Sequence, residues 1–147
     1  MKTSSAAAVA LLVLAGCTVP VKLQMRGVKP LNENERKENT PVDVRLYQLK
    51  DNGRFEQATI DNLWMKDKET LAEDLVAVKT VTVFPAEPQS APKVEDLGKL
   101  DPAIRFIGIL ALYAKEDEGK PRKVVVPVAE ADDVVWEFTG FHIRKGQ

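Results

Sequence analysis

Alternation of apolar and polar residues is the feature of this chain that most narrows what it can fold into. Residues 42–47 carry an apolar side chain at every second position, with charged side chains between them. Residues 76–84 repeat the pattern, and Val81 and Val83 are expected to face inward. Because successive side chains of a strand point to opposite faces of a sheet, both segments are predicted to be half-buried β-strands.

Four further segments have the character of strands. A weak first strand is expected from Leu23 onward, where apolar and polar residues alternate. Residues 104–114 are almost continuously apolar, as expected for a central strand covered on both faces. Residues 124–128 form another predicted strand, and Pro127 places its end at a sheet edge or bulge, because proline has no amide hydrogen to donate. Residues 136–143 alternate large apolar side chains and are predicted to form the last strand.

The segment between the second and third strands has a different spacing. Leu63, Leu71 and Leu75 recur roughly at helical turns within residues 60–75, which predicts one or two short helices. Six or so antiparallel strands with this helical excursion predict a mainly β fold, a two-sheet antiparallel β-sandwich, over residues 23–147. Two sheets stacked about 10 Å apart suit a domain of this length.

The N-terminus is organised like a secretory signal peptide. Lys2 supplies a positive charge, and an unbroken run of small or apolar residues extends from Ala6 to Gly16. This run is about half as long as the roughly 20-residue helix that crosses a bilayer, which argues against a permanent transmembrane segment. Residues 1–16 are therefore predicted to be removed on export.

The residues at the predicted cleavage site resemble a bacterial lipobox. They are Leu14, Ala15, Gly16 and Cys17. In a lipobox the cysteine takes a diacylglycerol on its thiol and usually a third acyl chain on its freed amine, which is enough for stable anchoring. Cys17 is the only cysteine, so acylation would consume a thiol that has no partner within the molecule. Residues 17–22 are predicted to be this acylated cysteine and a tether. Lipoproteins with Asp after the cysteine tend to stay in the inner membrane, whereas Thr18 favours the outer membrane.

The sequence offers little material for catalysis or metal binding. The 21 basic and 22 acidic residues nearly balance, which gives no electrostatic argument for binding nucleic acid. His142 is the only histidine, and without a second histidine or a free cysteine no transition-metal site is indicated. Ser90 is the only serine after the signal segment, and no Gly-x-Ser-x-Gly turn surrounds it. We expect no enzymatic activity and no cofactor, and a strand-end role without catalysis for His142.

The two tryptophans have different predicted roles. Trp136 alternates with Phe138 in the last predicted strand, which favours packing in the core. Trp64 lies in the helical segment and is equally compatible with the core and with a partner interface, where exposed aromatic side chains often anchor binding.

A polar segment stands out between the first two predicted strands. Residues 31–41 are rich in charged and amide side chains and are longer than a tight hairpin needs. Composition alone leaves two interpretations equally open: a solvated surface loop, or a recognition loop held on a rigid sandwich.

The most specific motif of the chain is Pro41-Val42-Asp43-Val44-Arg45-Leu46-Tyr47-Gln48-Leu49. Leu31 and Asn32 precede it, and Phe55, Asp61, Leu63 and residues 71–75 follow it. Further along the chain, Gly108 precedes Ile109, Leu110 and Ala111. Together with the lipobox, this order of motifs resembles the lipoproteins of type VI secretion systems, the family called TssJ, SciN or VasD.

The resemblance implies a transthyretin-like β-sandwich without known catalysis, held by lipid under the outer membrane and facing the periplasm. It also implies a partner, the periplasmic C-terminal domain of the inner-membrane protein TssM, which associates with TssL in the membrane complex that docks the injection machine. The family contacts TssM through the loop between the first two strands. That loop maps here onto Asn32, Glu33, Asn34, Glu35, Arg36, Lys37, Glu38, Asn39 and Thr40.

Within this loop the charged residues Glu33, Glu35, Arg36 and Lys37 are predicted to set the orientation and rate of association, while neighbouring apolar or backbone contacts supply most of the affinity. An alternative function for the same sandwich is a lipid-anchored periplasmic carrier or binding module for a small ligand, which needs an apolar pocket with a few converging polar groups. A third hypothesis, a lipid-anchored enzyme, needs a cleft lined by carboxylates.

Overall fold

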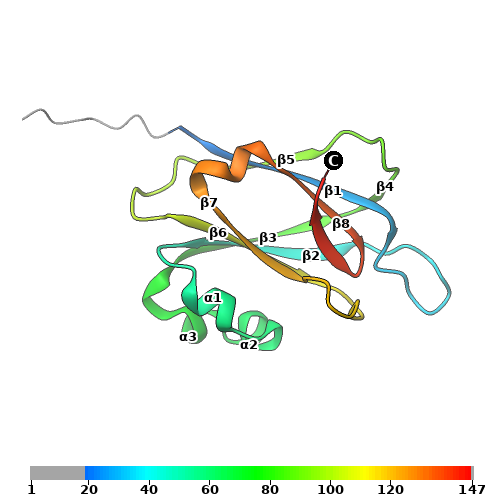
Figure 1. The fold of residues 1–147 in the computed structure, drawn as a ribbon, viewed down its shortest axis with the longest axis horizontal. Coiled ribbons are helices and arrows are strands. Elements are labelled where there is room, and N and C mark those ends of the chain that lie inside the picture. Colours follow the sequence, from blue (N-terminus) through cyan, green and yellow to red (C-terminus); the bar gives the residue numbers. More distant parts are fainter. Residues whose placement is uncertain (1–18, 147) are drawn as a thin grey trace, which may run out of the picture.

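The computed structural model describes residues 19–146 (Figure 1). The predicted signal segment and the lipobox residues Leu14, Ala15, Gly16 and Cys17 lie outside the described residues. Among the residues that are described, no helix is both long and apolar enough to cross a membrane.

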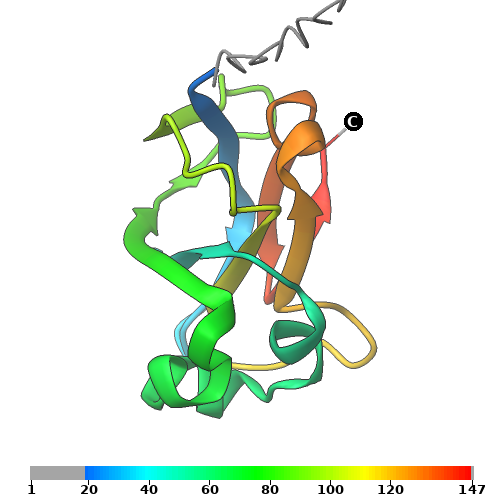
Figure 2. The ribbon, with the colours of Figure 1, turned by 90° about the vertical axis from the view of Figure 1, so that its left-hand side faces the viewer.

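Two β-sheets stack face to face, which confirms the predicted two-sheet, mainly β architecture (Figures 1 and 2). The first sheet contains β1 (Val21–Leu31), β4 (Pro85–Ala86), β5 (Lys93–Gly98), β8 (Val135–Gly140) and β9 (His142–Lys145). The second contains β3 (Leu75–Val83), β2 (Val42–Leu49), β6 (Phe106–Leu112) and β7 (Lys123–Pro127), in that spatial order. As predicted, the continuously apolar β6 is central and β7, which ends at Pro127, is an edge strand.

The prediction of antiparallel pairing was wrong for part of the first sheet. The second sheet is antiparallel throughout, but β1 pairs in parallel with both β8 and β4. A period of two shows which side chains share a face, and it carries no information on strand direction. Strands β1 and β8 are separated by most of the chain, so no short turn fixes their relative direction.

Two predicted strands have other boundaries in the structure, and one strand was not predicted. Strand β1 begins at Val21, so the last two residues of the predicted tether belong to the sheet, and Val21 is buried. The predicted last strand is a hairpin of β8 and β9, which turns at Gly140, where φ is +54°. Strand β5 was missed because its alternation is inverted: Glu95 faces inward, while Val94 is 52% exposed.

The main core fills the space between the sheets. Leu23 from the first sheet, and Val44 and Ile109 from the second, are fully buried there. Trp136 is only 3% exposed and belongs to this cluster, as its alternation with Phe138 predicted. Burying large apolar side chains from both sheets is what holds the two layers together.

A helical layer covers the outer face of the second sheet (Figure 2). It contains α1 (Gly53–Gln57), α2 (Ile60–Met65), α3 (Asp67–Leu71) and the 3₁₀ turn η1 (Ala72–Asp74). The layer therefore has more helices than the one or two predicted. A second 3₁₀ turn, η2 (Val128–Asp133), lies elsewhere and precedes β8. Phe55 of α1 packs on β6 where residue 108 is glycine, and a Cβ there would lie 2.8 Å from the Phe55 ring. The motif glycine therefore leaves room for the helical layer.

Two long basic side chains fix the helical layer to the sheet. Lys123 of β7 donates hydrogen bonds through Nζ to the carbonyl oxygens of Phe55 and Glu56, at 2.6 and 2.7 Å. The guanidinium of Arg45 lies 4.0 Å from the centre of the Trp64 ring and donates a 2.8 Å hydrogen bond to the Trp64 carbonyl. Trp64 is half-buried in this contact, which assigns it to packing against the sheet.

Candidate partner-binding loop

The polar segment between β1 and β2 crosses from one sheet to the other and projects from the end of the sandwich (Figure 1). Strand β1 runs toward it from the N-terminal side, and β2 leaves it for the other sheet. The loop therefore lies at the opposite end of β1 from the point where the described chain begins.

Asn32 holds the base of the loop and is 8% exposed. Its Nδ2 donates to Thr40 Oγ1 at 2.9 Å and to the carbonyl of Pro41 at 3.0 Å, which closes the loop. Its Oδ1 accepts the amide hydrogen of Ala114 at 2.9 Å, and its own amide donates to the carbonyl of Gly140 at 2.8 Å. Asn32 has φ of 45°, a left-handed conformation that asparagine tolerates better than most residues. The side chain and backbone amide of this one residue thus join three loops at this end of the molecule.

Two more asparagines organise the interior of the loop. Asn34 Oδ1 accepts the amide hydrogens of Arg36 and Glu38, at 2.8 and 3.0 Å. Asn39 Oδ1 accepts the amide hydrogen of Leu31 at 2.6 Å. These bonds give the loop a defined backbone, because asparagine side chains commonly replace backbone partners in turns.

The charged side chains of the loop point outward. Glu35, Arg36, Lys37 and Glu38 are exposed, and Glu33 is partly exposed. The ion pairs among them are long, 3.7 Å for Arg36–Glu38 and 3.9 Å for Lys37–Glu33, and exposed pairs of this kind contribute little to stability. The nine predicted contact residues therefore divide into four that shape the loop (Asn32, Asn34, Asn39 and Thr40) and five that present charge.

A neighbouring cluster that the sequence did not reveal lies beside the base of this loop. His142 Nδ1 is 2.8 Å from Asp117 Oδ2, and this hydrogen bond lowers the pKa of the Asp117 carboxyl. The Tyr113 hydroxyl donates a 2.6 Å hydrogen bond to the carbonyl of His142, and burial raises the pKa of that phenol. The Tyr113 ring meets Phe141 edge to face, with centroids 6.4 Å apart. His142 therefore joins the β6–β7 loop to the β8–β9 hairpin. Only contacts between segments remote in sequence reveal this role.

The side chains described at this end of the molecule make hydrogen bonds and ion pairs. Ser90, the residue with which His142 would have to form a nucleophilic pair, accepts a 2.9 Å hydrogen bond from Arg26 through its carbonyl oxygen. Within residues 19–146, no group of three or more His, Cys, Asp or Glu side chains is placed to hold a metal ion. The arrangement suits recognition of another surface.

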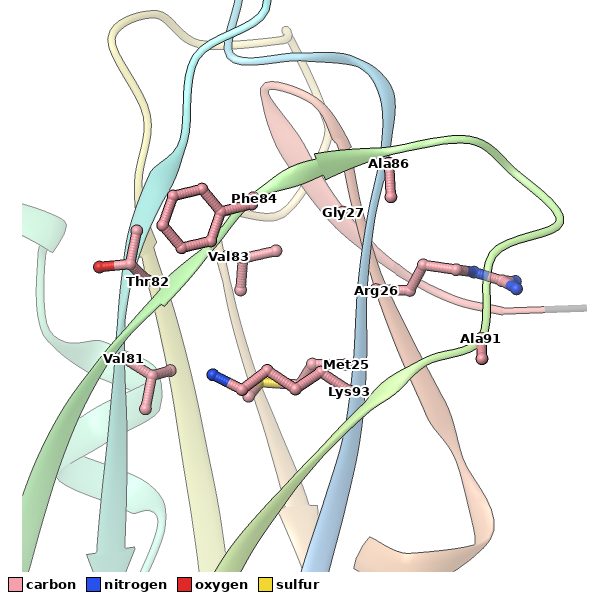
Figure 3. A pocket seen from close by; sticks show the side chains of 10 residues that line it. All are labelled: Met25, Arg26, Gly27, Val81, Thr82, Val83, Phe84, Ala86, Ala91 and Lys93. Atoms are coloured by element: carbon pink, nitrogen blue, oxygen red, sulfur yellow. The ribbon is translucent and has the colours of Figure 1, made fainter.

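A small apolar pocket opens on the side of the sandwich (Figure 3). It lies where β3, β4 and the start of β5 approach β1, and it has a volume of about 130 Å³. Val81 and Val83 line one wall, Met25 and Gly27 line the other, and Phe84, which is 65% exposed, lies at its rim.

Comparison with known proteins identifies the family. The sequence matches the family of type VI secretion lipoproteins that includes VasD, EvfM and TssJ, over residues 19–139. No curated protein sequence matches this chain.

Solved structures agree with the family match. A chain of a type VI membrane complex is 30% identical, with a TM-score of 0.73, and the match covers 86% of this chain and 96% of that one. A chain of the structure described as the type VI secretion protein TssM C-terminal domain from EAEC is 26% identical, with a TM-score of 0.70 and coverages of 86% and 96%. Lip from Serratia marcescens, described as a membrane-bound component of the type VI secretion system, is 15% identical with a TM-score of 0.73 and coverages of 87% and 97%, and it shows the shared fold.

The family match spans most of the chain and includes the strands from β1 to β7 and most of β8, the helical layer and the loop at the end of β1. The family consists of structural secretion lipoproteins rather than enzymes. This chain belongs to the type VI secretion lipoprotein family.

Proposed function

We propose that this chain is a structural component of a type VI secretion membrane complex, anchored in the outer membrane through acylated Cys17 and facing the periplasm. Residues 32–40 bind the periplasmic C-terminal domain of TssM, and through TssM the chain is linked indirectly to TssL. The family match and the similarity to a chain of a type VI membrane complex support this function.

The main support for this function is that hydrogen bonds fix the conformation of the loop. Asn32, Asn34 and Asn39 fix its backbone with hydrogen bonds, so five charged side chains are presented from a defined surface. A preorganised loop loses less conformational entropy on binding than a mobile one, which leaves more of the contact energy as affinity. Lipid anchoring also confines the domain near its partner and raises the effective concentration, so a modest patch is sufficient.

Charge reversal at the tip tests the site. We expect Glu35→Lys, Arg36→Glu and Lys37→Glu, combined in one variant, to weaken binding to the TssM periplasmic domain at least tenfold, because the charges steer and orient the encounter. The measurement is a calorimetric titration of the soluble domain, made without Cys17. The effect should shrink as salt rises, because exposed charges are screened.

A matched control reverses exposed charges elsewhere. Lys22→Glu, Lys99→Glu and Glu130→Lys reverse the same numbers of charges of each sign at positions that are also exposed, near the start of β1 and far from the loop. This control should bind like the unmodified domain. Unchanged affinity in the loop variant, with circular dichroism showing that both variants are folded, would refute the proposed contact.

A further inference from the structure

Strand β3 is a free edge of the second sheet and has few of the features that usually protect such an edge. It pairs with β2 from Val83 opposite Val42 to Leu75 opposite Leu49, with one irregularity at Val76, and within residues 19–146 no other strand pairs with it. Its nine residues include no proline or glycine and a single charge, Lys79. Soluble proteins usually protect such edges with charges, prolines or bulges, since free backbone groups accept another strand.

Both faces of β3 present apolar side chains that an added strand could contact. Val76 and Val78 are 40% and 39% exposed on the face toward the helical layer. On the other face, Val81 and Val83 form a wall of the apolar pocket (Figure 3). Side chains of an added strand would alternate between these faces, so one of them would enter the pocket.

The pocket has the size of one side chain. Its volume of about 130 Å³ is close to that of an engineered apolar cavity of about 150 Å³ that binds benzene. Met25, Gly27 and Ala86 make the inner wall apolar, and Ala91 lies at the outer rim (Figure 3). The pocket is therefore suited to a branched or aromatic side chain.

Lys93 lines the pocket, and the charges on it and its ionic partners indicate which kind of residue would flank that side chain. Lys79 forms an ion pair with Glu95, and Lys93 lies 4.0 Å from the same carboxylate. Glu95 is 9% exposed, whereas the Lys79 and Lys93 side chains are 48% and 68% exposed. Two ammonium groups share one carboxylate, which leaves a net positive charge that complements an acidic residue in the occupant.

The pocket is continuous with the base of the candidate loop. Val83, in its wall, is paired with Val42, the first residue of β2. Pro41 directly precedes Val42, and its carbonyl accepts a hydrogen bond from Asn32. A partner that contacts the loop therefore lies next to the free edge of β3.

We infer that the free edge of β3 is a second docking site for the same partner, where one extended segment adds as a strand and places an apolar side chain, flanked by an acidic residue, in the pocket between the sheets. This inference rests on the proposed function, since it takes the periplasmic domain of TssM as the source of the segment. Backbone hydrogen bonds along the edge supply affinity, and the pocket supplies selectivity.

Two exposed positions allow the site to be blocked without disturbing the core. Ala91→Phe covers the mouth of the pocket, and Val78→Lys places a charge on the bare edge. Each is expected to weaken binding of the TssM periplasmic domain about tenfold or more in a calorimetric titration. Ala103→Phe is the matched control, because Ala103 is exposed in the loop after β5, whose Gly98 pairs with Val21 at the far end of β1. It should bind like the unmodified domain.

Hydrogen exchange provides a second readout that does not depend on substitutions. Strand addition should slow exchange of alternate amides between Val76 and Val83 when the partner is bound. Full affinity of both blocking variants, or unchanged hydrogen exchange in β3 of the complex, would overturn this inference. If the loop variant still lost binding in that case, the proposed loop contact would stand. Absence of binding by the unmodified folded domain would refute the proposed function and this inference together. Loss of self-association in the blocking variants would assign the edge to a second copy of the chain and overturn the inference.

Discussion

Asn32 fixes the conformation of the candidate binding loop. The resemblance placed it among the contact residues, but the structure buries it. Its Nδ2 closes the loop, and its Oδ1 joins the loop to the β6–β7 loop. Its role depends on Ala114 and Gly140, which are remote in sequence, and on a left-handed backbone. A local pattern contains neither piece of information. The charged side chains at the tip are exposed, as is usual for charged residues.

Replacing Asn32 with alanine should destabilise the domain by about 3 kcal/mol. The change removes three hydrogen bonds of about 1 kcal/mol each and leaves the backbone amide of Ala114 without its partner. It also places alanine at positive φ, where its Cβ is strained and its side chain makes no hydrogen bond to offset the strain. Asn32→Gly should cost about 1 kcal/mol less, because glycine adopts that conformation without strain. Urea unfolding at neutral pH measures both values. Asn62→Ala, at an exposed position of α2, is the control and should change stability by less than about 1 kcal/mol. Equal stability of the alanine variant and the parent would show that the network is dispensable.

At the scale of elements, alternation predicted strands well where an apolar face is buried. Strand β2 lies close to where alternation placed it, because the core between the sheets selects the face that alternation marks. Strand β6 lies close to where its almost continuous apolar run placed it, because both of its faces are covered. Strand β5 escaped prediction because an inward glutamate, Glu95, is neutralised by Lys79 from the other sheet. The β8–β9 hairpin was predicted as one strand because its turn consists only of Gly140 and Phe141. Two residues are too few to interrupt the alternation visibly in the sequence.

Glu137 ties three strands of the first sheet together. It lies in β8, is 5% exposed, and accepts hydrogen bonds from Arg26 of β1 and, at 2.9 Å, from Arg144 of β9. Burial raises the pKa of the Glu137 carboxyl, but the two arginines outweigh burial and hold it below its ordinary value of 4.5. Because parallel pairing between β1 and β8 has no connecting turn, this pair of contacts helps to fix the register of the mixed sheet.

Glu137→Gln should therefore destabilise the domain by about 3 kcal/mol at pH 7, since it leaves Arg26, whose side chain is only 16% exposed, without its counter-charge. The unfolded state binds the proton more readily, so the contribution of Glu137 is fully present above about pH 4.5 and is lost as pH falls through the lowered folded pKa. Urea unfolding of parent and variant at pH 7 and at pH 3 measures this, and the difference should shrink at the lower pH. Glu87→Gln, which breaks an exposed pair with Lys29, should cost less than about 1 kcal/mol. A difference that is the same at both pH values would show that ionisation of Glu137 is not involved.

At the scale of the whole molecule, β1 separates the two ends that the proposed function uses. The chain enters the sandwich at Val21, four residues after Cys17, and β1 continues for 11 residues to Leu31, where the candidate loop begins (Figure 1). At about 3.3 Å per residue this strand spans roughly 33 Å. A domain held by lipid at Cys17 can therefore direct its loop and the adjacent end of β3 away from the membrane and toward an inner-membrane partner.

If the proposed anchor and the docking surface act separately, two substitutions at the predicted lipid-attachment site should change location without changing binding. Cys17→Ser should leave the protein soluble after cell fractionation, because no acyl chain is attached, while the purified domain binds the TssM periplasmic domain with unchanged affinity. Thr18→Asp should keep the lipid but shift the protein to the inner-membrane fraction, since lipoproteins with Asp after the cysteine tend to stay there. Fractionation and titration together test whether anchoring and docking are independent. Weakened binding by the soluble Cys17→Ser domain would show that the N-terminal segment takes part in the contact itself, and membrane retention of that variant would show that something other than the lipid anchors the protein.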